Sequence, residues 1–360
     1  MRRALLLILL CCWSFARFAY AAPLPQILPA DSAPAVMAPP AHWRSAEQSW
    51  LTFPEWYLVH SPAEYARYLA DDRPPSQFPW WGHIGQLWRS YARVSQAQLA
   101  SRPRQLNPGY HLMIVVIATS TTCEYALRSL YELSIGRLAE LSRQHGPTAE
   151  ERFAAKTAQD YVDFIRERPW YEFDFLARLK SLWRDTGYGG NDLLRKWERK
   201  YALSTEYGIK AVYAWLIAKA TRATYDAAQP VTAVFVDRWQ DRLVGGWPEI
   251  KRIKSVREGG ELLLLPRYHG FIAPAVAMAR SGTNFSEIAG NGADTRLLLS
   301  VLVPADWAPD SEGAVSVFEQ PVLSRPGEKR VVISVPIRDL AQNLRELDGM
   351  GIHIEHIYDF

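Results

Sequence analysis

The sequence predicts a multi-domain protein in which an all-α domain is followed by a ferredoxin-like α+β domain. Its 360 residues are enough for two domains. The 14 Trp and 17 Tyr lie mostly before residue 250, among helix start and stop signals. After Pro230 the pattern changes to short apolar runs separated by Gly, Asp and Pro, which is typical of strands. We therefore expect a helical domain at 43–228 and an α+β domain at 229–360.

The N-terminus has the composition of a signal peptide over residues 1–21. Two arginines precede an apolar run at 4–13, and Ala19 and Ala21 supply the small side chains that a signal peptidase reads. This run is too short to span a bilayer, which needs about 20 apolar residues. The alternative is an uncleaved anchor over 4–22, which would tether the chain to a membrane. In either case we expect an exported protein that is periplasmic or associated with the cell envelope.

Removal of this segment changes the charge balance. Arg2, Arg3 and Arg17 leave with it, so that 41 basic residues become 38, equal to the 38 acidic residues. Nucleic-acid binding needs an excess of Lys and Arg on one face, and we therefore expect no nucleic-acid partner. Cys123 remains as the single thiol, which excludes an intramolecular disulfide. Within an apolar helix it is expected to be a small buried side chain.

Helix start signals recur through the first domain. Residues 22–42 are rich in Pro and Ala and predict an extended tether ahead of it. Capping boxes begin at Thr52, Ser61 and Thr148, each with Glu three residues later. The first two predict separate short helices at 52–59 and 61–70. Further helices are expected at 83–99, 149–167, 171–185 and 192–226, and the last segment is either one helix or two helices joined near Leu203–Thr205.

The most apolar stretch after the leader covers residues 110–127. It contains His111, Glu124 and several hydroxyl side chains. These polar groups favour a buried helix of a soluble domain over a membrane span.

We expect the second domain to have an order close to β-α-β-β-α-β, with an extra strand or hairpin inserted. Apolar runs on either side of 258–260 predict the hairpin, and 270–282 predicts a short helix. The chain ends as strand, helix and strand, with Gly349 and Gly351 as helix stops. This order predicts the ferredoxin-like topology.

Motifs that carry familiar chemistry are absent from the sequence. It has no Gly-rich phosphate loop, no His-Glu-x-x-His and no Gly-x-Ser-x-Gly turn. His353 and His356 have the spacing of metal ligands on a helix, but a strand is predicted there, and residues three apart on a strand point to opposite faces. We therefore expect no cofactor and no metal.

One weak anion site is suggested by Arg267 and His269. Both precede a predicted helix N-terminus, where backbone N–H groups attract anions. The alternative is that they cap a surface loop.

Two segments of the helical domain share a pattern, EYALRSLYELSIGRL at 124–138 and EYGIKAVYAWLIAKA at 206–220. Glu, a basic residue, Tyr and Ile recur at offsets that fall on one helix face at about 100° per residue. The Tyr and Ile mark that face as inward. Glu four residues before a base also favours an intrahelical pair. The matched pairs are Glu124 and Glu206, Arg128 and Lys210, Tyr131 and Tyr213, and Ile135 and Ile217.

Two interpretations of this pattern are open. In the structural one, the four charged residues form a partly buried ion-pair network between packed helices. In the functional one, these charges line a ligand pocket with Tyr131 and Tyr213, or Glu124 and Glu206 form an acid–base pair with a raised pKa. Carboxylate-bridged metal chemistry needs Glu-x-x-His, which the chain lacks.

The function we expect is non-catalytic binding of a small ligand or a protein partner at the cell envelope. It rests on the missing catalytic motifs together with the leader and the tether. A metal-independent enzyme acting through Glu124 or Glu206 is one alternative. A structural envelope protein is the other.

Overall fold

The computed structural model describes residues 37–46, 52–100, 108–222, 230–240, 246–256, 260–310 and 313–360. The chain divides into two compact units. We call them the sheet unit and the helical unit. The sheet unit comprises the described residues of Met1–Glu55, Gly85–Ile114 and Gln229–Phe360, and the helical unit those of Trp56–Ile84 and Val115–Ala228. Helices precede the strands along the chain, as the mixed α and α+β prediction requires.

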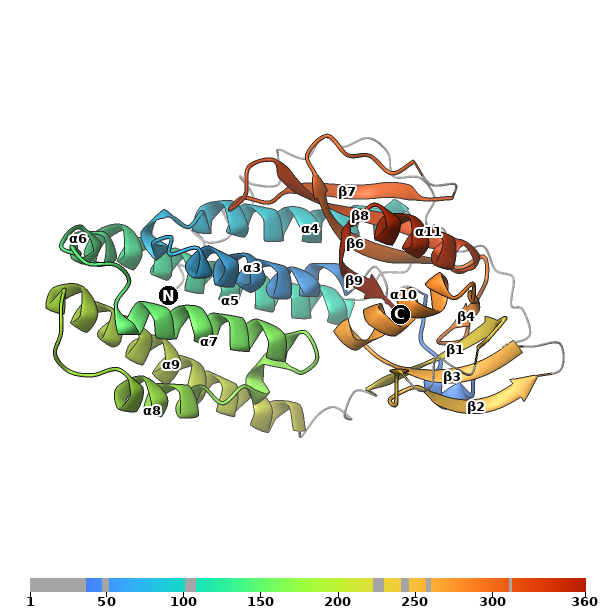
Figure 1. Cartoon of the computed structure of the whole chain (residues 1–360), viewed down its shortest axis with the longest axis horizontal. Helices are drawn as coiled ribbons and strands as arrows, with labels where there is room; N and C mark the ends of the chain where they lie inside the picture. Colours follow the sequence, from blue (N-terminus) through green and yellow to red (C-terminus); the bar gives the residue numbers. More distant parts are fainter. Residues whose placement is uncertain are drawn as a thin grey trace. The chain divides into compact units, whose positions relative to one another are not determined.

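Helices form most of the chain from Phe53 to Arg222. Figure 1 shows α7, α8 and α9 side by side, and these three helices contact one another. The turn labelled η4 is π-helical and joins α5 directly to α6. The elements are η2 (Pro40–His42), α3 (Phe53–Ala70), η3 (Pro75–Gln77), α4 (Trp80–Ala100), α5 (Pro108–Tyr131), η4 (Glu132–Gly136), α6 (Arg137–Leu141), α7 (Ala149–Ile165), η5 (Trp170–Glu172), α8 (Phe175–Asp185) and α9 (Leu193–Arg222).

Two helices continue where a break was predicted or considered, and the predicted break between 59 and 61 was wrong. Helix α3 runs through Pro62, where separate helices at 52–59 and 61–70 were expected. Burial of Tyr57 before the proline and Ala66 after it outweighs the loss of one backbone hydrogen bond. Helix α9 likewise continues past Leu203. Leu203 is buried in an apolar cluster with Leu182 of α8 and with Phe173, which lies just before α8.

The capping box at the start of α7 is confirmed. The Thr148 hydroxyl accepts a hydrogen bond from the Glu151 backbone N–H, and the Glu151 carboxylate accepts one from the Thr148 backbone N–H. Two backbone donors that have no partner within the helix are thereby satisfied.

The strands form two antiparallel sheets. One has the order β2-β3-β1-β4-β5 and the other the order β7-β8-β6-β9. The ferredoxin-like topology is therefore not confirmed. The elements are β1 (Val231–Asp237), β2 (Lys251–Val256), β3 (Gly260–Pro266), α10 (His269–Arg280), β4 (Asn284–Ile288), β5 (Asn291–Gly292), β6 (Arg296–Pro304), β7 (Val315–Pro321), β8 (Glu328–Pro336), α11 (Ile337–Gly349) and β9 (His353–Tyr358).

The two sheets repeat one topology. In each, three strands are followed by a helix and a fourth strand, and the fourth strand pairs with the first. The third strands end at Pro266 and Pro336, and the helices are followed by Gly282 and Gly351 at positive φ. Helices α10 and α11 pack against each other, and each also contacts the last strand of the other repeat. The sheet unit thus contains one strand and helix topology twice.

The end of the predicted tether is bound to the sheet unit. The Glu287 carboxylate on β4 accepts hydrogen bonds from the backbone N–H groups of Met37 (2.7 Å) and Ala38 (2.8 Å). The Arg44 N–H donates to the Ala289 carbonyl at 3.0 Å. The C-terminal residues of the predicted tether over 22–42 are therefore bound to the sheet unit and do not form part of a free tether.

Among the residues that the structure describes, no helix has both the length and the apolar character needed to cross a membrane.

Candidate functional site

The helical unit pairs the two segments that share a sequence pattern. Lys210 Nζ lies 3.0 Å from a Glu124 carboxylate oxygen and 2.9 Å from one of Glu206. Arg128 forms an ion pair with the other oxygen of Glu206. The predicted inter-helix network of Glu124, Arg128, Glu206 and Lys210 therefore forms.

The network follows from two identical charge spacings on antiparallel helices. Each segment has Glu at its first position and a base four residues later. When two such helices run in opposite directions, each Glu lies opposite the base of its partner. Glu124 thus meets Lys210 and Arg128 meets Glu206. Each segment supplies the countercharges of the other.

The charges of this network stabilise one another in their ionised forms. Burial alone would raise the pKa of the Glu206 carboxyl, but Arg128 and Lys210 outweigh it and lower that pKa to about 2. Burial opposes the charge of Arg128 and Lys210 as well, yet the neighbouring glutamates raise the pKa of both bases. A carboxyl that stays ionised at neutral pH is a poor proton donor. This arrangement therefore fits a charge network better than an acid–base pair.

The two tyrosines of the pattern lie apart from these ion pairs. The Tyr131 hydroxyl donates to Glu198 at 2.9 Å. Tyr213 is 42% exposed and its ring lies beside that of Trp170, with 5.3 Å between centroids. Ile135 is 54% exposed, so the prediction that Tyr and Ile face inward was wrong for Tyr213 and Ile135. In the first segment the π-helical turn adds a residue to the helical repeat and changes the direction of the positions that follow.

A larger buried network, missed by the sequence reasoning, continues from the π-helical turn. Arg199 donates to both carboxylate oxygens of Glu132, at 2.9 and 3.0 Å, and also to Glu198. All three side chains are at most 5% exposed. Because a carboxylate and a guanidinium match in geometry, such bidentate pairs are strong.

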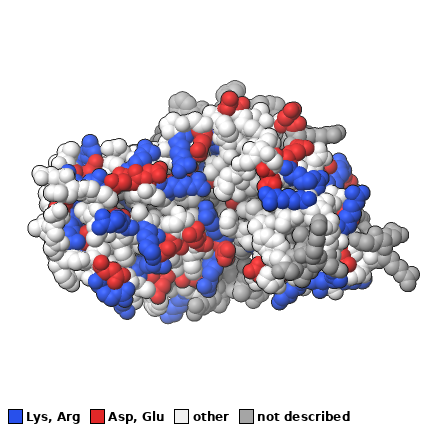
Figure 2. Space-filling model, viewed as in Figure 1, with Lys and Arg blue, Asp and Glu red and all other residues white. Residues whose placement is uncertain are grey.

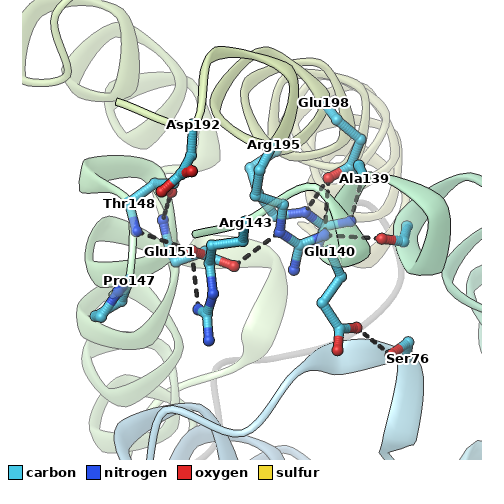
Figure 3. A network of polar contacts seen from close by, with 12 residues as sticks. Ser76, Ala139, Glu140, Arg143, Pro147, Thr148, Glu151, Asp192, Arg195 and Glu198 are labelled. Atoms are coloured by element: carbon cyan, nitrogen blue, oxygen red, sulfur yellow. Dashed lines mark hydrogen bonds and ion pairs between the residues drawn. The ribbon is translucent and has the colours of Figure 1, made fainter. Parts of the chain in front are cut away.

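Arg195 extends the network to α7 and to the backbone of the π-helical turn. It donates to Glu151 at 2.8 Å, to Glu198 at 3.0 Å and to the Gly136 carbonyl at 3.0 Å. Figure 3 shows Arg143 approaching the same Glu151 carboxylate, at 3.3 Å, so that the chain of charges reaches the surface. Burial would raise the pKa of the Glu151 carboxyl, but Arg195, the Thr148 N–H and Arg143 together lower it.

Two lysines of α9 complete the buried set. Lys196 Nζ lies 2.8 Å and Lys200 Nζ 3.4 Å from one carboxylate oxygen of Glu150, and all three residues are buried. Lys200 also donates to the carbonyl oxygens of Thr186 and Gly187. Charged residues of α9 are thus directed into the unit, where other elements bind them.

Gly136 allows the π-helical turn and the network to coexist. A Cβ at this position would collide with the Glu132 carboxylate and would lie 3.3 Å from Arg199 Nη2. A side chain here would therefore displace the bidentate pair.

The sequence signal for this network is the run Arg-Lys-Trp-Glu-Arg-Lys at 195–200. A charged run on a helix is ordinarily a solvated face, and the spacing alone gives no reason to read it otherwise. Here the five charged residues are buried and Trp197 is exposed. The counterions come from Glu132, Glu150 and Glu151, far away in the sequence, which is why the run alone did not reveal the site.

The side of α5–η4–α6 and α9 that faces away from the core is apolar. We call this side the outer face, and the name covers only residues of the helical unit. Helix α5 was expected to be buried, and this prediction was wrong for these positions. Cys123 is also exposed, contrary to expectation. The large apolar residues of the face, each 37–70% exposed, are Val115, Val116, Leu127, Leu130, Leu133, Ile135, Leu138, Leu141, Leu193, Leu194, Trp197, Tyr201, Ile209, Val212, Tyr213, Trp215 and Leu216.

A second polar cluster in the helical unit surrounds His83. The Tyr57 hydroxyl lies 2.9 Å from His83 Nδ1, and a Glu64 carboxylate oxygen lies 3.6 Å from Nε2. The ring of Phe78 stacks on the imidazole with centroids 4.6 Å apart. All four residues are buried, so this cluster packs the interior of the unit.

At the weak anion site, groups of the protein itself contact Arg267. Arg267 donates to the Phe360 carbonyl at 2.7 Å, and its Nε lies 3.5 Å from Asp359, which also contacts Arg44. Burial raises the pKa of the Asp359 carboxyl, although both arginines oppose this. His269 is the first residue of α10. Protein groups therefore already contact the guanidinium that was expected to bind an anion.

Within the described part of the chain, no group of three or more His, Cys, Asp or Glu is arranged to hold a metal ion. Comparison with family models, with curated proteins and with solved structures finds no match to this chain.

Proposed function

We propose that the protein is a non-catalytic component of the cell envelope that binds an apolar partner through the outer face of its helical unit. The proposal includes export to the periplasm or another part of the envelope. The basic and apolar composition of residues 1–21 supports this location.

The observation that carries the proposal is the inverted placement of polar and apolar side chains on α9 and α5. A helix that faces water ordinarily directs its charges outward and its apolar stripe inward. On α9 the buried positions include Arg195 and Arg199, whereas Leu194, Trp197 and Tyr201 are exposed. Contiguous apolar surface of this extent marks a site of interaction.

The buried charges support this surface from within. Arg195 and Arg199 connect α9 to the π-helical turn and to α7. Both arginines are buried and bonded to these elements, so the network can act as a scaffold for the outer face. Because buried ion pairs contribute little net stability but fix the relative positions of their partners, we propose that the network sets the spacing of α5 and α9.

Cys123 provides a direct test, because it lies on the outer face and is exposed. In a full chain carrying Cys11→Ser and Cys12→Ser it is the one thiol. We expect a water-soluble maleimide to label it slowly in intact envelopes of the source cells. Labelling should become at least tenfold faster in the purified protein after detergent is removed.

The control places the thiol on the charged surface of α7. Lys156 is exposed there, and a chain with Cys11→Ser, Cys12→Ser, Cys123→Ser and Lys156→Cys should react equally fast in both preparations. If Cys123 in intact envelopes reacts as fast as in the purified chain, no partner covers the outer face and the proposal fails.

A further inference from the structure

The outer face is continuous across two helices. Successive residues of a helix are turned by about 100° around its axis. On both α5 and α9, the exposed positions are centred roughly 120° around the axis from the charged residues that join the two helices. They lie on the side of each helix that faces away from its buried apolar positions. The two helices are antiparallel and share one core side. Their exposed apolar positions therefore lie together on the opposite side of the pair.

Charged side chains are almost excluded from this face. From Val115 to Leu141, the charged side chains exposed by more than two fifths are Glu124 and Arg137, and Arg137 pairs with Glu140. From Leu193 to Lys219, Lys219 is the one charged residue among the exposed positions. Helix α7 in the same unit differs, because it exposes Arg152, Lys156, Gln159 and Asp163. Figure 2 shows basic and acidic side chains intermixed over the side on which α7 lies. The helical unit thus has one charged side and one apolar side.

Aromatic residues and lysines lie together along α9. Lys200 Nζ lies 5.2, 5.0 and 5.6 Å from the ring centres of Trp183, Tyr188 and Trp197. Near the other end of the helix, Lys219 Nζ lies 5.5 Å from the ring of Trp215. Lys200 is buried and paired with Glu150, so it holds these rings from inside the unit, whereas Lys219 is exposed. An exposed Trp next to an exposed Lys, as at Trp215 and Lys219, is characteristic of the boundary between lipid headgroups and acyl chains, because each side chain has an apolar body and a polar tip.

The geometry points to a lipid bilayer as the apolar partner, and we infer that α5–η4–α6 and α9 lie in the plane of the membrane surface with the outer face among the acyl chains. This inference rests on the proposed function and names the partner of the same face. The apolar face from Val115 to Leu141 is about 40 Å long at 1.5 Å per residue, longer than the hydrocarbon core of about 30 Å. The charged side of α7 requires water. Both properties fit a helix pair lying along the interface.

A second copy of the chain fits this face less well. Paired helices of a coiled coil use a narrow apolar seam flanked by charged residues that set register and orientation. Here the exposed apolar residues spread over a wide arc of both helices, and a charged flank is missing from the positions described above. The apolar segment at 4–13 also directs the chain to a membrane.

The test uses the purified full chain with a polarity-sensitive fluorophore on Cys123 and vesicles of phosphatidylcholine. We expect the emission to shift to shorter wavelength as the chain binds the vesicles. Because the face carries so few charges, binding should change little between about 0.05 and about 0.5 M salt. Leu130→Gln with Ile209→Gln should weaken partitioning by about tenfold or more, since each replacement removes apolar surface from the acyl region.

Ile253→Gln is the matched control. Ile253 is an exposed apolar residue of β2 with charged neighbours, and its replacement should leave partitioning unchanged. Helicity and melting temperature should also be unchanged in Leu130→Gln with Ile209→Gln, because both side chains are more than half exposed. Equal partitioning of wild type and this variant would overturn the inference.

Two other outcomes would show that the partner is not a bilayer and would leave the proposed function standing. If Cys123 is protected in native envelopes but the purified chain does not bind vesicles, the partner is a protein and the proposed function stands. If sedimentation shows a dimer that protects Cys123 without lipid, the partner is a second copy. If Cys123 is unprotected in the envelope, both proposals fail.

Discussion

Helices α9 and α11 divide their residues between core and solvent in opposite ways. Helix α11 buries Leu340 and Leu344 and exposes Arg338, as a helix that faces water should. Helix α9 buries Arg195 and exposes Trp197. The inner side of α11 is held by apolar packing, whereas the inner side of α9 is held largely by ion pairs. The difference teaches that the charge pattern of a helix does not identify its solvated side when countercharges lie on its neighbours.

The largest effect is expected from removing one member of the buried network. Arg199→Leu leaves Glu132 without its bidentate partner in a buried site. Loss of one partner of a buried ion pair costs about 3–5 kcal/mol. Urea unfolding followed by tryptophan fluorescence should show this as a lower midpoint.

The matched control for this variant is Arg338→Leu on α11. Arg338 pairs with Asp294, and both side chains are more than half exposed. A surface pair of this kind contributes about 0–1 kcal/mol. If Arg338→Leu and Arg199→Leu lower stability equally, the contrast between the two helices is wrong.

Leucines of the two regions should respond in opposite ways to truncation. Leu344→Ala on α11 removes a fully buried side chain and should lower the free energy of unfolding by about 2–5 kcal/mol. Leu138→Ala on α6 removes a side chain that is 70% exposed and should change it by about 0.5 kcal/mol or less in lipid-free solution. Chemical denaturation of both variants measures the difference, and a large loss for Leu138→Ala would show that its side chain packs inside the unit.

A smaller loss is expected from Gly136→Ala. The new Cβ would press against the Glu132 carboxylate and force the network to shift, which should cost about 1–3 kcal/mol. Gly208→Ala on α9 is the control, because its Cβ would meet no atom within 4 Å and alanine favours a helix. Thermal melting should rank Gly208→Ala at or above wild type, and the reverse ranking would contradict the role given to Gly136.

The last effect depends on pH and arises at Glu206. Its pKa is lowered from 4.5 to about 2 in the folded chain, so the unfolded chain binds the proton more readily. The stability that this carboxylate contributes is therefore fully present above about pH 5 and is lost as the pH falls towards 2. In Glu206→Gln this contribution is absent, and the melting temperatures of variant and wild type should converge over that interval. A constant difference from pH 7 to pH 2.5 would contradict the assigned ion pairs.

Much of the fold could be predicted from local sequence signals. The capping box at Thr148 and the helix stop at Gly351 depend on neighbouring residues, and both are seen in the structure. The interruption expected at Pro62 is missing because burial on both sides of the proline stabilises one helix. The division of the strands into two sheets depends on pairing between distant segments, which local patterns do not encode.

The candidate site was predicted only in part, again because it depends on residues that are far apart in the sequence. The spacing of Glu124 and Arg128 indicated a charged stripe, and its partners on α9 were found by the shared pattern. The outward direction of Ile135 was not predictable from an ideal repeat, because Ile135 lies within the π-helical turn. The buried state of Arg199 depends on Glu132, which lies 67 positions away in the sequence.

The measurement that tests the central claim most directly compares nitroxide labels on Cys123 and on Lys156→Cys in the presence of phosphatidylcholine vesicles. Oxygen concentrates in acyl chains, whereas a water-soluble nickel complex is excluded from them. At Cys123 we predict that vesicles increase collisions with oxygen and reduce collisions with nickel, while the label at position 156 keeps the behaviour it has in water. Equal access of the nickel complex to both labels would contradict the account.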